Sequence, residues 1–275
     1  MLTKIALIDV PPITIVFARL FIASVVMAIA MLWVGQKLMP MFAHWKWVIA
    51  AALTGNAMPF FLITWGQEKV DAGLTAILMA IMPLMTIVIA HFSVGDERLN
   101  LFKVIGFCFG LIGVIVLIGW DKLASLGGET IRQYSIVGGA FCYALHAIIS
   151  KKLASMPRLA ISTAILIASS LMLLPVSLLI DQPWNLSISN VSLGTLLMLG
   201  IFPTAIGTLM LFMIVGREGA GFLSQINFLV PVFGVLWAIA FLDEVLPTNA
   251  VFALVIILVG VAIARINSNS MEKTS

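Results

Sequence analysis

The sequence predicts an all-α, polytopic membrane protein with nine transmembrane helices, built on an inverted five-plus-five repeat that lacks its first helix. Three observations lead there: the composition, the spacing of the apolar runs and an internal repeat. Apolar residues make up 62% of the chain and charged residues only 10%, whereas globular domains have about 45–50% and about 25%. A water-soluble chain of 275 residues cannot bury so much apolar surface, so lipid is the expected solvent.

The apolar runs have the length of bilayer-spanning helices, which need about 20 mostly apolar residues. Short polar breaks separate them, and only Asp121–Gln133 is long enough to connect two halves. The polar tail Asn267–Ser275 is expected to follow the last span. In order, the nine predicted spans are Pro12–Val34, Lys46–Gly66, Gly73–Ser93, Leu101–Gly119, Tyr134–Lys151, Ala160–Ile180, Val191–Val215, Ala220–Leu242 and Pro247–Arg265.

An internal repeat relates the two halves of the chain. The stretch Ala80–Val116 resembles Phe228–Ala264, and matching residues recur in the same order at a nearly constant spacing, which indicates a duplication. The matched pairs are Pro11 with Pro157, Gly55 with Gly200, Glu68 with Glu218, Pro83 with Pro231, Glu97 with Glu244 and Gly113 with Gly260.

The repeat also suggests how the chain begins. Shifted back by 146 positions, the predicted span Tyr134–Lys151 falls mostly before Met1, so Met1–Leu7 matches only the end of a helix. We therefore expect a five-plus-five plan whose first helix is missing, with a groove beside Pro12–Val34. A genuine nine-helix protein is the alternative. A secretory signal peptide fits poorly, because Asp9–Pro12 interrupts the apolar run.

The basic residues predict the orientation, because cytoplasmic loops are rich in Lys and Arg. Of the 15 basic residues, one side of the predicted membrane holds ten, the other holds four, and Arg19 lies within a span. The richer side is expected to be cytoplasmic, which puts the C-terminus in the cytoplasm. Five helices per half invert the second repeat relative to the first, and inverted repeats are typical of secondary transporters.

Three stretches resemble the EamA-type ten-helix transporters of the drug/metabolite transporter superfamily. They are "DVPPITIVFARLFIA" (Asp9–Ala23), "GLTAILMAIMPLMTIVIAHFSVGDERLN" (Gly73–Asn100) and "GFLSQINFLVPVFGVLWAIAFLDEVL" (Gly221–Leu246). The resemblance implies two EamA-type repeats, an incomplete one over 1–120 and a second over 134–266, followed by a cytoplasmic tail, 267–275. It further implies ATP-independent export of amino acids or other small metabolites across a bacterial inner membrane, with no cofactor. A small-molecule substrate and the lipid bilayer are the expected partners, and a homodimer is one of the oligomeric states that the sequence allows.

Polar residues within predicted spans are the first candidates for a substrate site, because they are costly in lipid unless they are paired or face water. Arg19 lies about seven residues into its span and could attract a substrate carboxylate or an acidic partner. Alternatively, it anchors its helix by snorkelling or by bonding backbone carbonyls. Asn56, in "TGNAMPFF" with Phe60, could contact substrate or link two helices through hydrogen bonds.

A second group of candidates precedes Pro231 in the second half. Ser224 and Asn227 are three residues apart and can share a helix face, whereas Gln225 and Asn227 are two apart and cannot. Prolines inside spans, with Pro83 and Pro231 at paired positions, break helical hydrogen bonds and so suggest a central passage. Membrane helices are also richer in proline than soluble ones in general.

Further candidates carry ionisable or small side chains. Tyr143 and His146 are three apart in "FCYALHAIIS" and share a face; His146 could relay protons or simply pack. The four carboxylates at span ends, Glu68, Glu97, Glu218 and Glu244, are read as helix caps or gating residues. Gly106 and Gly110 form a GxxxG pair, which is typical of close helix packing.

Other function classes find little support. The two cysteines give neither a disulfide framework nor a metal-ligand spacing, and 15 basic against 12 acidic residues is no nucleic-acid signal. An enzyme is not expected, because HExxH and Walker motifs are absent and no span interior holds an acidic pair. A membrane channel or scaffold without active transport is the alternative function, although no rings of charged residues indicate an ion pore.

The role of His146 generates a first prediction. If His146 carries the coupled proton, His146→Gln should abolish pH-dependent exchange, because glutamine does not titrate, while substrate counterflow continues. Flux measured in liposomes at several external pH values checks this. An unchanged pH dependence in the variant would reject the relay role.

Overall fold

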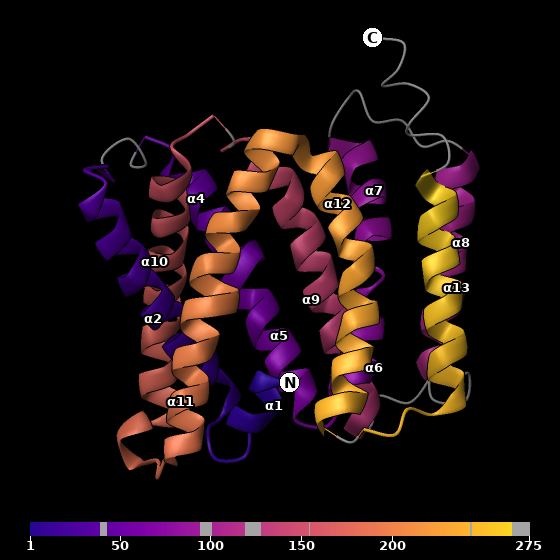
Figure 1. Ribbon diagram of the computed structural model, residues 1–275, viewed down its shortest axis with the longest axis horizontal. Helices are drawn as coiled ribbons and strands as arrows, with labels where there is room; N and C mark the ends of the chain where they lie inside the picture. The colour runs from indigo at the N-terminus through magenta and orange to yellow at the C-terminus, as the bar shows by residue number, and fades with distance from the viewer. Residues whose placement is uncertain (39–42, 94–100, 119–127, 154, 243, 266–275) are drawn as a thin grey trace. The chain divides into compact units, whose positions relative to one another are not determined.

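The computed structural model describes residues 1–38, 43–93, 101–118, 128–153, 155–242 and 244–265, apart from the side chains of 128, 212, 215–229, 231 and 265. Within these residues the chain is helical and contains no strand. Six helical stretches, ordered in the chain as Figure 1 shows, have the length and apolar character to cross a bilayer. They are Pro12–Trp33, Trp45–Gln67, Ala72–Ser93, Leu101–Ile118, Arg158–Asp181 and Asn190–Leu211.

These findings confirm the predicted all-α, polytopic fold. The predicted missing first helix and the inverted relation of the repeats stay predictions. The elements are α1 (Leu2–Ala6), α2 (Pro12–Trp33), α4 (Trp45–Ala52), η1 (Leu53–Ala57), α5 (Met58–Gln67), α6 (Ala72–Met79), α7 (Met82–Ser93), α8 (Leu101–Ile118), α9 (Gly128–Lys151), α10 (Arg158–Val176), η3 (Ser177–Asp181), η4 (Pro183–Asn185), α11 (Asn190–Leu199), η5 (Gly200–Ile206), α12 (Gly207–Leu242) and α13 (Thr248–Arg265).

Two predicted boundaries were wrong. We expected a break between Val215 and Ala220, but the backbone of α12 is helical through this stretch. α12 has 36 residues and contains the end of one predicted span and all of the next. Likewise α9 begins at Gly128, within the expected connector. Helical backbone satisfies its own hydrogen bonds, so a polar break in the sequence need not end a helix.

The helices form two compact units, each with segments from both sequence halves. Unit 1 contains Met1–Glu68 and Ile149–Leu223, and unit 2 contains Lys69–Ile148 and Ser224–Ser275. In unit 1, α2 packs against α10, and in unit 2, α8 packs against α13. Members of each pair occupy matching places in the predicted repeats, so packing joins the halves within each unit.

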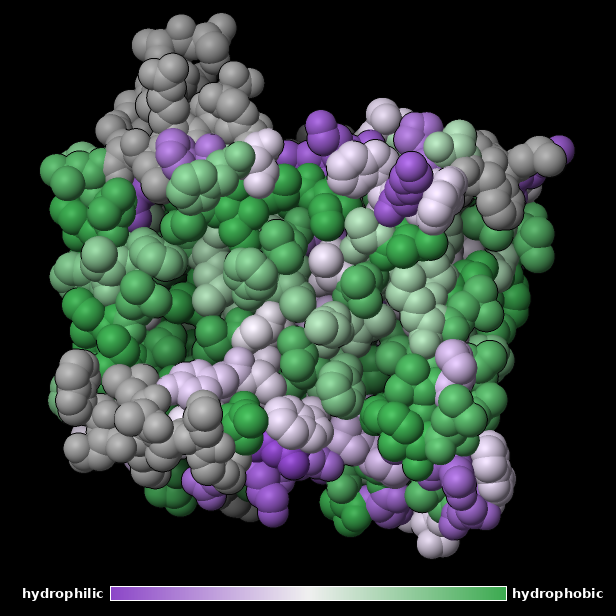
Figure 2. Space-filling view, turned by 180° about the vertical axis from the view of Figure 1, so that it is seen from behind, coloured by the Kyte–Doolittle hydropathy of each residue, from purple (hydrophilic) through white to green (hydrophobic). Residues whose placement is uncertain are grey.

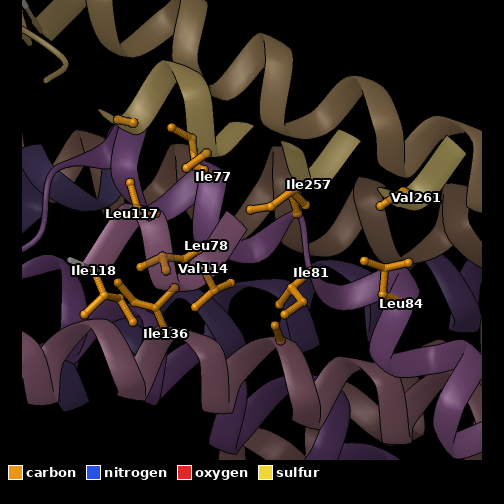
Figure 3. Packing of buried hydrophobic residues seen from close by; sticks show 14 of the residues in the cluster. Ile77, Leu78, Ile81, Leu84, Val114, Leu117, Ile118, Ile136, Ile257 and Val261 are labelled. Atoms are coloured by element: carbon orange, nitrogen blue, oxygen red, sulfur yellow. The ribbon is translucent and has the colours of Figure 1, made fainter. Parts of the chain in front are cut away.

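The core of unit 2 is a cluster of aliphatic side chains from five elements. Figure 3 shows Ile77 and Leu78 of α6, Leu84 of α7, Val114 and Leu117 of α8, Ile136 of α9 and Ile257 of α13 converging. Ile81, between α6 and α7, lies in the same cluster and is 1% exposed. Tight aliphatic packing therefore holds α6, α7, α8, α9 and α13 together.

Glycines bring α8 and α13 into backbone contact, as the GxxxG pair predicts for Gly106. A Cβ placed on Gly260 would lie 2.6 Å from the carbonyl oxygen of Gly106, and one on Gly106 would collide with the carbonyl of Gly260. Gly110 instead packs against the Leu84 side chain of α7. Close approach of this kind is open only to residues without a side chain.

Unit 1 has a smaller core around α2. Val16, Leu20, Ala23 and Met27 of α2 pack with Leu166 of α10 and Ala205 of η5, and all six are buried. α2 and α10 lie side by side in Figure 1. The four α2 positions recur at three- and four-residue spacing, so they lie on one face of the helix. The opposite face includes exposed Phe21, Val25 and Ile29, as expected of a surface in contact with lipid.

Carboxylates from distant parts of the chain cap helix N-termini. Glu244 accepts hydrogen bonds from the backbone N–H groups of Ala72 and Gly73, at 2.8 Å each, and so caps α6. Asp181 accepts from the backbone N–H and hydroxyl of Thr14, also at 2.8 Å, and so caps α2. Glu244 was predicted as a cap or gating residue, and it does cap a helix, α6, although it directly precedes α13. Each carboxylate satisfies donors that the first turn leaves without a helical partner.

The surface has the distribution that a membrane imposes. In Figure 2, apolar residues cover the middle of the visible helices, and hydrophilic residues gather toward the helix ends. Many large apolar side chains are well exposed, among them Leu32, Leu171 and Phe252. In water such a surface would aggregate, whereas in a bilayer it faces acyl chains.

The α8–α13 contact gives a stability prediction. Gly106→Ala should lower the free energy of unfolding by about 1–3 kcal/mol, because the new methyl group meets backbone that cannot move cheaply. Gly194→Ala is the matched control, since its Cβ would meet nothing within 4 Å. The control should be neutral or gain up to about 1 kcal/mol from helix propensity. Thermal unfolding in detergent compares the two, and equal effects would contradict the packing.

A second prediction concerns Asp9, in the loop before α2. It accepts a hydrogen bond from the backbone N–H of Ser189, the N-cap of α11, at 2.9 Å. Hydrogen bonds from the Ser192 hydroxyl, and then from Ser189, lower the pKa of Asp9 from its usual 3.8. A lowered pKa stabilises the fold above the unfolded-state value, and the gain is lost as the pH falls through the folded-state value. Asp9→Asn should therefore unfold at a lower temperature than wild type at pH 6. This difference should shrink as the pH falls below 3.8, and a pH-independent difference would contradict a stabilising role of the Asp9 carboxylate.

Candidate functional site

Arg19 lies on α2 in the interior of unit 1, where only 9% of the residue is exposed. Its Nε and Nη2 atoms donate hydrogen bonds to the hydroxyl oxygen of Thr204, at 3.1 and 2.9 Å. An arginine side chain is not deprotonated in proteins, so Arg19 carries a positive charge. Unit 1 therefore holds a permanent cation within a predicted membrane span.

The ring of Phe60, on α5, forms the second surface against Arg19. The guanidinium carbon lies 3.9 Å from the ring centroid, well within the range of a cation–π contact. Phe60 itself packs on the small core around α2. Of the two sequence-based interpretations of Arg19, substrate attraction stays a prediction, and the anchoring that we observe uses a hydroxyl and a ring.

Thr204 can receive both hydrogen bonds because its own proton is directed elsewhere. Pro203 has no N–H and so leaves the carbonyl of Leu199, four residues earlier, without its α-helical donor. The Thr204 hydroxyl donates to that carbonyl at 2.7 Å. Its oxygen lone pairs then accept from Arg19. The proline, the threonine and the arginine form one connected arrangement.

Asn56, on η1, makes a related contact with α10. Its side-chain Nδ2 donates to the hydroxyl of Ser169 at 3.2 Å, and both residues are buried. The Ser169 hydroxyl donates in turn to the carbonyl of Ile165 at 2.7 Å. Asn56 thus links two helices, which was one of its two predicted roles; the role in substrate contact stays a prediction. Asn56 and Phe60 are four residues apart, so they share one side of their helix.

The spans containing these residues are irregular next to proline. The π-helical segment η1 directly precedes α5, which has Pro59 as its second residue, and η5 contains Pro203. In unit 2, α6 ends at Met79 and α7 restarts at Met82, one residue before Pro83. Segments of π-helix occur often at functional sites. The predicted interruption of the helix is visible at Pro83, whereas the backbone of α12 is helical through Pro231.

The structure divides the predicted site residues. Arg19 and Phe60 contact each other in unit 1, which also contains Asn56, whereas Pro83, Tyr143 and His146 belong to unit 2. Tyr143 and His146 are both partly buried on α9, three residues apart as predicted. The backbone of Ser224, Gln225, Asn227 and Pro231 lies in α12, but their side chains are outside the part that the structure describes.

Sequence reasoning missed Thr204 and Ser169, the partners of Arg19 and Asn56. Both are 1% exposed or less, although hydroxyls are unremarkable in apolar runs. A signal existed for Thr204, because it directly follows a proline that removes a helical donor. Ser169 had no comparable signal, since its contact depends on how α10 packs against η1.

The site combines a fixed cation, an aromatic face and an amide. Such groups can hold a small anion such as a carboxylate, through charge-assisted hydrogen bonds to the guanidinium. No cluster of three or more metal-binding side chains occurs among the described residues.

Relatives with curated names are transporters. The chain is 24% identical to an uncharacterized transporter, YoaV, of Bacillus subtilis, over 94% of this chain and 88% of that protein. It is 26% identical to a probable terminal-alkyne amino-acid exporter of Streptantibioticus cattleyicolor, over 85% and 77%. It is 24% identical to a probable amino-acid metabolite efflux pump of Escherichia coli, over 94% and 87%.

A solved crystal structure shares the fold, with a TM-score of 0.70 at 20% identity over 96% of this chain and 91% of the other. The EamA-like transporter family matches residues 1–119 and 133–266. Together with the apolar helices, these matches indicate an integral membrane protein and a transporter rather than an enzyme. The chain belongs to the EamA-like transporter family.

Proposed function

We propose that this small-molecule transporter is a secondary exporter of metabolites such as amino acids, working by alternating access across the bacterial inner membrane. The observation that carries the proposal is the buried cation Arg19, held by Thr204 and Phe60. A cation in a medium of low dielectric attracts a carboxylate strongly. Two relatives, at 24–26% identity, are named for the export of amino acids or their metabolites.

The proposal includes an orientation and an energy source. The excess of basic residues on one side supports a cytoplasmic C-terminus. The sequence contains no Walker motif, so the substrate gradient or a coupled ion would supply the energy. The irregular segments η1 and η5 offer places where helices could bend between states.

The test is saturable transport by the full chain in liposomes. Vesicles containing the purified protein are loaded with each of the twenty common amino acids, and efflux is measured against protein-free vesicles. We expect saturable efflux of at least one of them. An absence of saturable efflux for all of them would sink the amino-acid proposal, and single-channel currents in a planar bilayer would favour the channel alternative.

Arg19 supplies the sharper prediction. Arg19→Gln should reduce transport by about 10–100-fold, the typical value of a hydrogen bond to a charged group. Arg158→Gln, the same change at the start of α10, is the control and should transport like wild type. Arg19→Lys keeps the charge and should retain partial activity if it folds, as gel filtration and thermal unfolding would check. Wild-type transport by a folded Arg19→Gln protein would refute the role of the cation.

A further inference from the structure

Two carboxylates hold one end of unit 1 together in a reciprocal way. Asp181, the last residue of η3, accepts hydrogen bonds from the backbone N–H and the hydroxyl of Thr14, in the first turn of α2, at 2.8 Å each. Asp9, just before α2, accepts from the backbone N–H of Ser189, the N-cap of α11, at 2.9 Å. The chain before α11 thus caps α2, and the chain before α2 caps α11. We call these four residues the clasp.

A further hydroxyl strengthens the Asp181 half of the clasp. Because the hydroxyl of Thr14 donates to Asp181, its oxygen accepts from the hydroxyl of Ser177, 3.1 Å away. Thr14 is 4% exposed, and Ser177 is fully buried. Hydrogen bonds to a carboxylate are stronger than those between neutral groups, and both carboxylates lie at the positive ends of helix dipoles. Opening the clasp would leave the buried donors of Thr14 without acceptors, which is costly.

The internal repeat gives the clasp a counterpart at the opposite end of unit 1. The start of α2 after Pro11 matches the start of α10 after Pro157. The ends of these helical stretches match as well, because each is followed by a residue with left-handed backbone. These residues are Gly35 after α2, with φ of 72°, and Gln182 after η3, with φ of 47°. Because η3 ends where α2 begins, α10 begins at the other end of the unit, where α2 ends.

The carboxylates of the clasp are not repeated at that other end. Val34, before the left-handed glycine, takes the place of Asp181. Ser155, two residues before the proline that precedes α10, takes the place of Asp9. Neither connection at this end, from α2 to α4 or from α9 to α10, contains an Asp or a Glu. A unit built from matching halves is therefore tied by carboxylates at one end, and its sequence offers none at the other.

We infer that the clasp is a conformational device, which keeps the starts of α2 and α11 and the end of η3 together throughout the transport cycle, so that α2 and α10 move apart at their opposite ends. The inference rests on the proposed function, because alternating access requires helices to move. Apolar packing between α2 and α10 is non-directional and permits small tilts. Hydrogen bonds weaken steeply when their geometry changes, so the clasp end resists such tilts.

Two engineered disulfides test where unit 1 moves, in a background with both native cysteines changed to serine. Thr14→Cys with Asp181→Cys links the clasp end. Met27→Cys with Thr163→Cys links α2 and α10 toward the other end, where the Thr163 hydroxyl lies 3.2 Å from the carbonyl oxygen of Met27. Efflux of the best-transported amino acid of the liposome screen is measured for each pair, oxidised and then reduced.

Oxidation of the clasp pair should change efflux by less than about twofold, whereas oxidation of the other pair should reduce efflux about tenfold or more, because it blocks the movement that transport requires. A reductant should restore this loss. Loss of efflux on oxidation of the clasp pair would overturn the inference. Undiminished efflux after oxidation of the other pair would overturn it as well.

Hydrogen exchange in lipid nanodiscs provides a readout that needs no substrate. In wild type, backbone amides at the start of α2 should exchange about tenfold more slowly than those at the start of α10. Asp181→Ala should speed exchange at the start of α2 about fivefold, as expected for the loss of a helix cap. Val34→Ala, the matched change at the repeated position, should leave exchange at the start of α10 unchanged.

Equal exchange at the two helix starts in wild type, or unchanged exchange at the start of α2 in Asp181→Ala, would overturn the inference. Absence of amino-acid efflux by wild type would defeat the proposed function alone. The exchange rates would then still decide whether the clasp end is the more firmly held end of unit 1.

Discussion

The constraint on which the rest of this structure depends is that lipid offers no hydrogen bonds. Each backbone N–H and C=O inside the bilayer therefore needs a partner from the protein itself. Regular helix supplies these partners everywhere except at helix ends and next to proline. At Pro203 the chain widens into the π-helical segment η5, and the Thr204 hydroxyl also donates to the carbonyl of Leu199, at 2.7 Å. At the starts of α2 and α6, Asp181 and Glu244 accept from the exposed N–H groups. At these two helix starts, carboxylates from distant parts of the chain lie where the helical backbone leaves donors unsatisfied.

The same constraint explains why distant parts of the chain meet. Asp181 follows α10 and caps α2, which is about 170 residues earlier in the chain, and Glu244 follows α12 and caps α6. Each unit thereby joins helices of both sequence halves. A duplicated five-helix sequence provides a capping carboxylate of this kind twice. The polar contacts Arg19–Thr204 and Asn56–Ser169 also share one pattern. In both, a hydroxyl that donates to its own helix accepts from a side chain of the other half.

Hydropathy was enough to predict the helical class and most spans, because a run of about 20 apolar residues has the length and composition of a helix that crosses a bilayer. The Gly106–Gly110 pair also predicted its packing correctly at Gly106, because a GxxxG pair in a membrane helix is typical of the close approach of a second helix. Partners were harder to predict. Nothing local to Ser169 or Asp181 identifies Asn56 or Thr14, because these contacts depend on how helices more than 100 residues apart pack. The break expected between Val215 and Ala220 was misjudged for a different reason: charged residues predict a break, but the helical backbone of α12 continues through them.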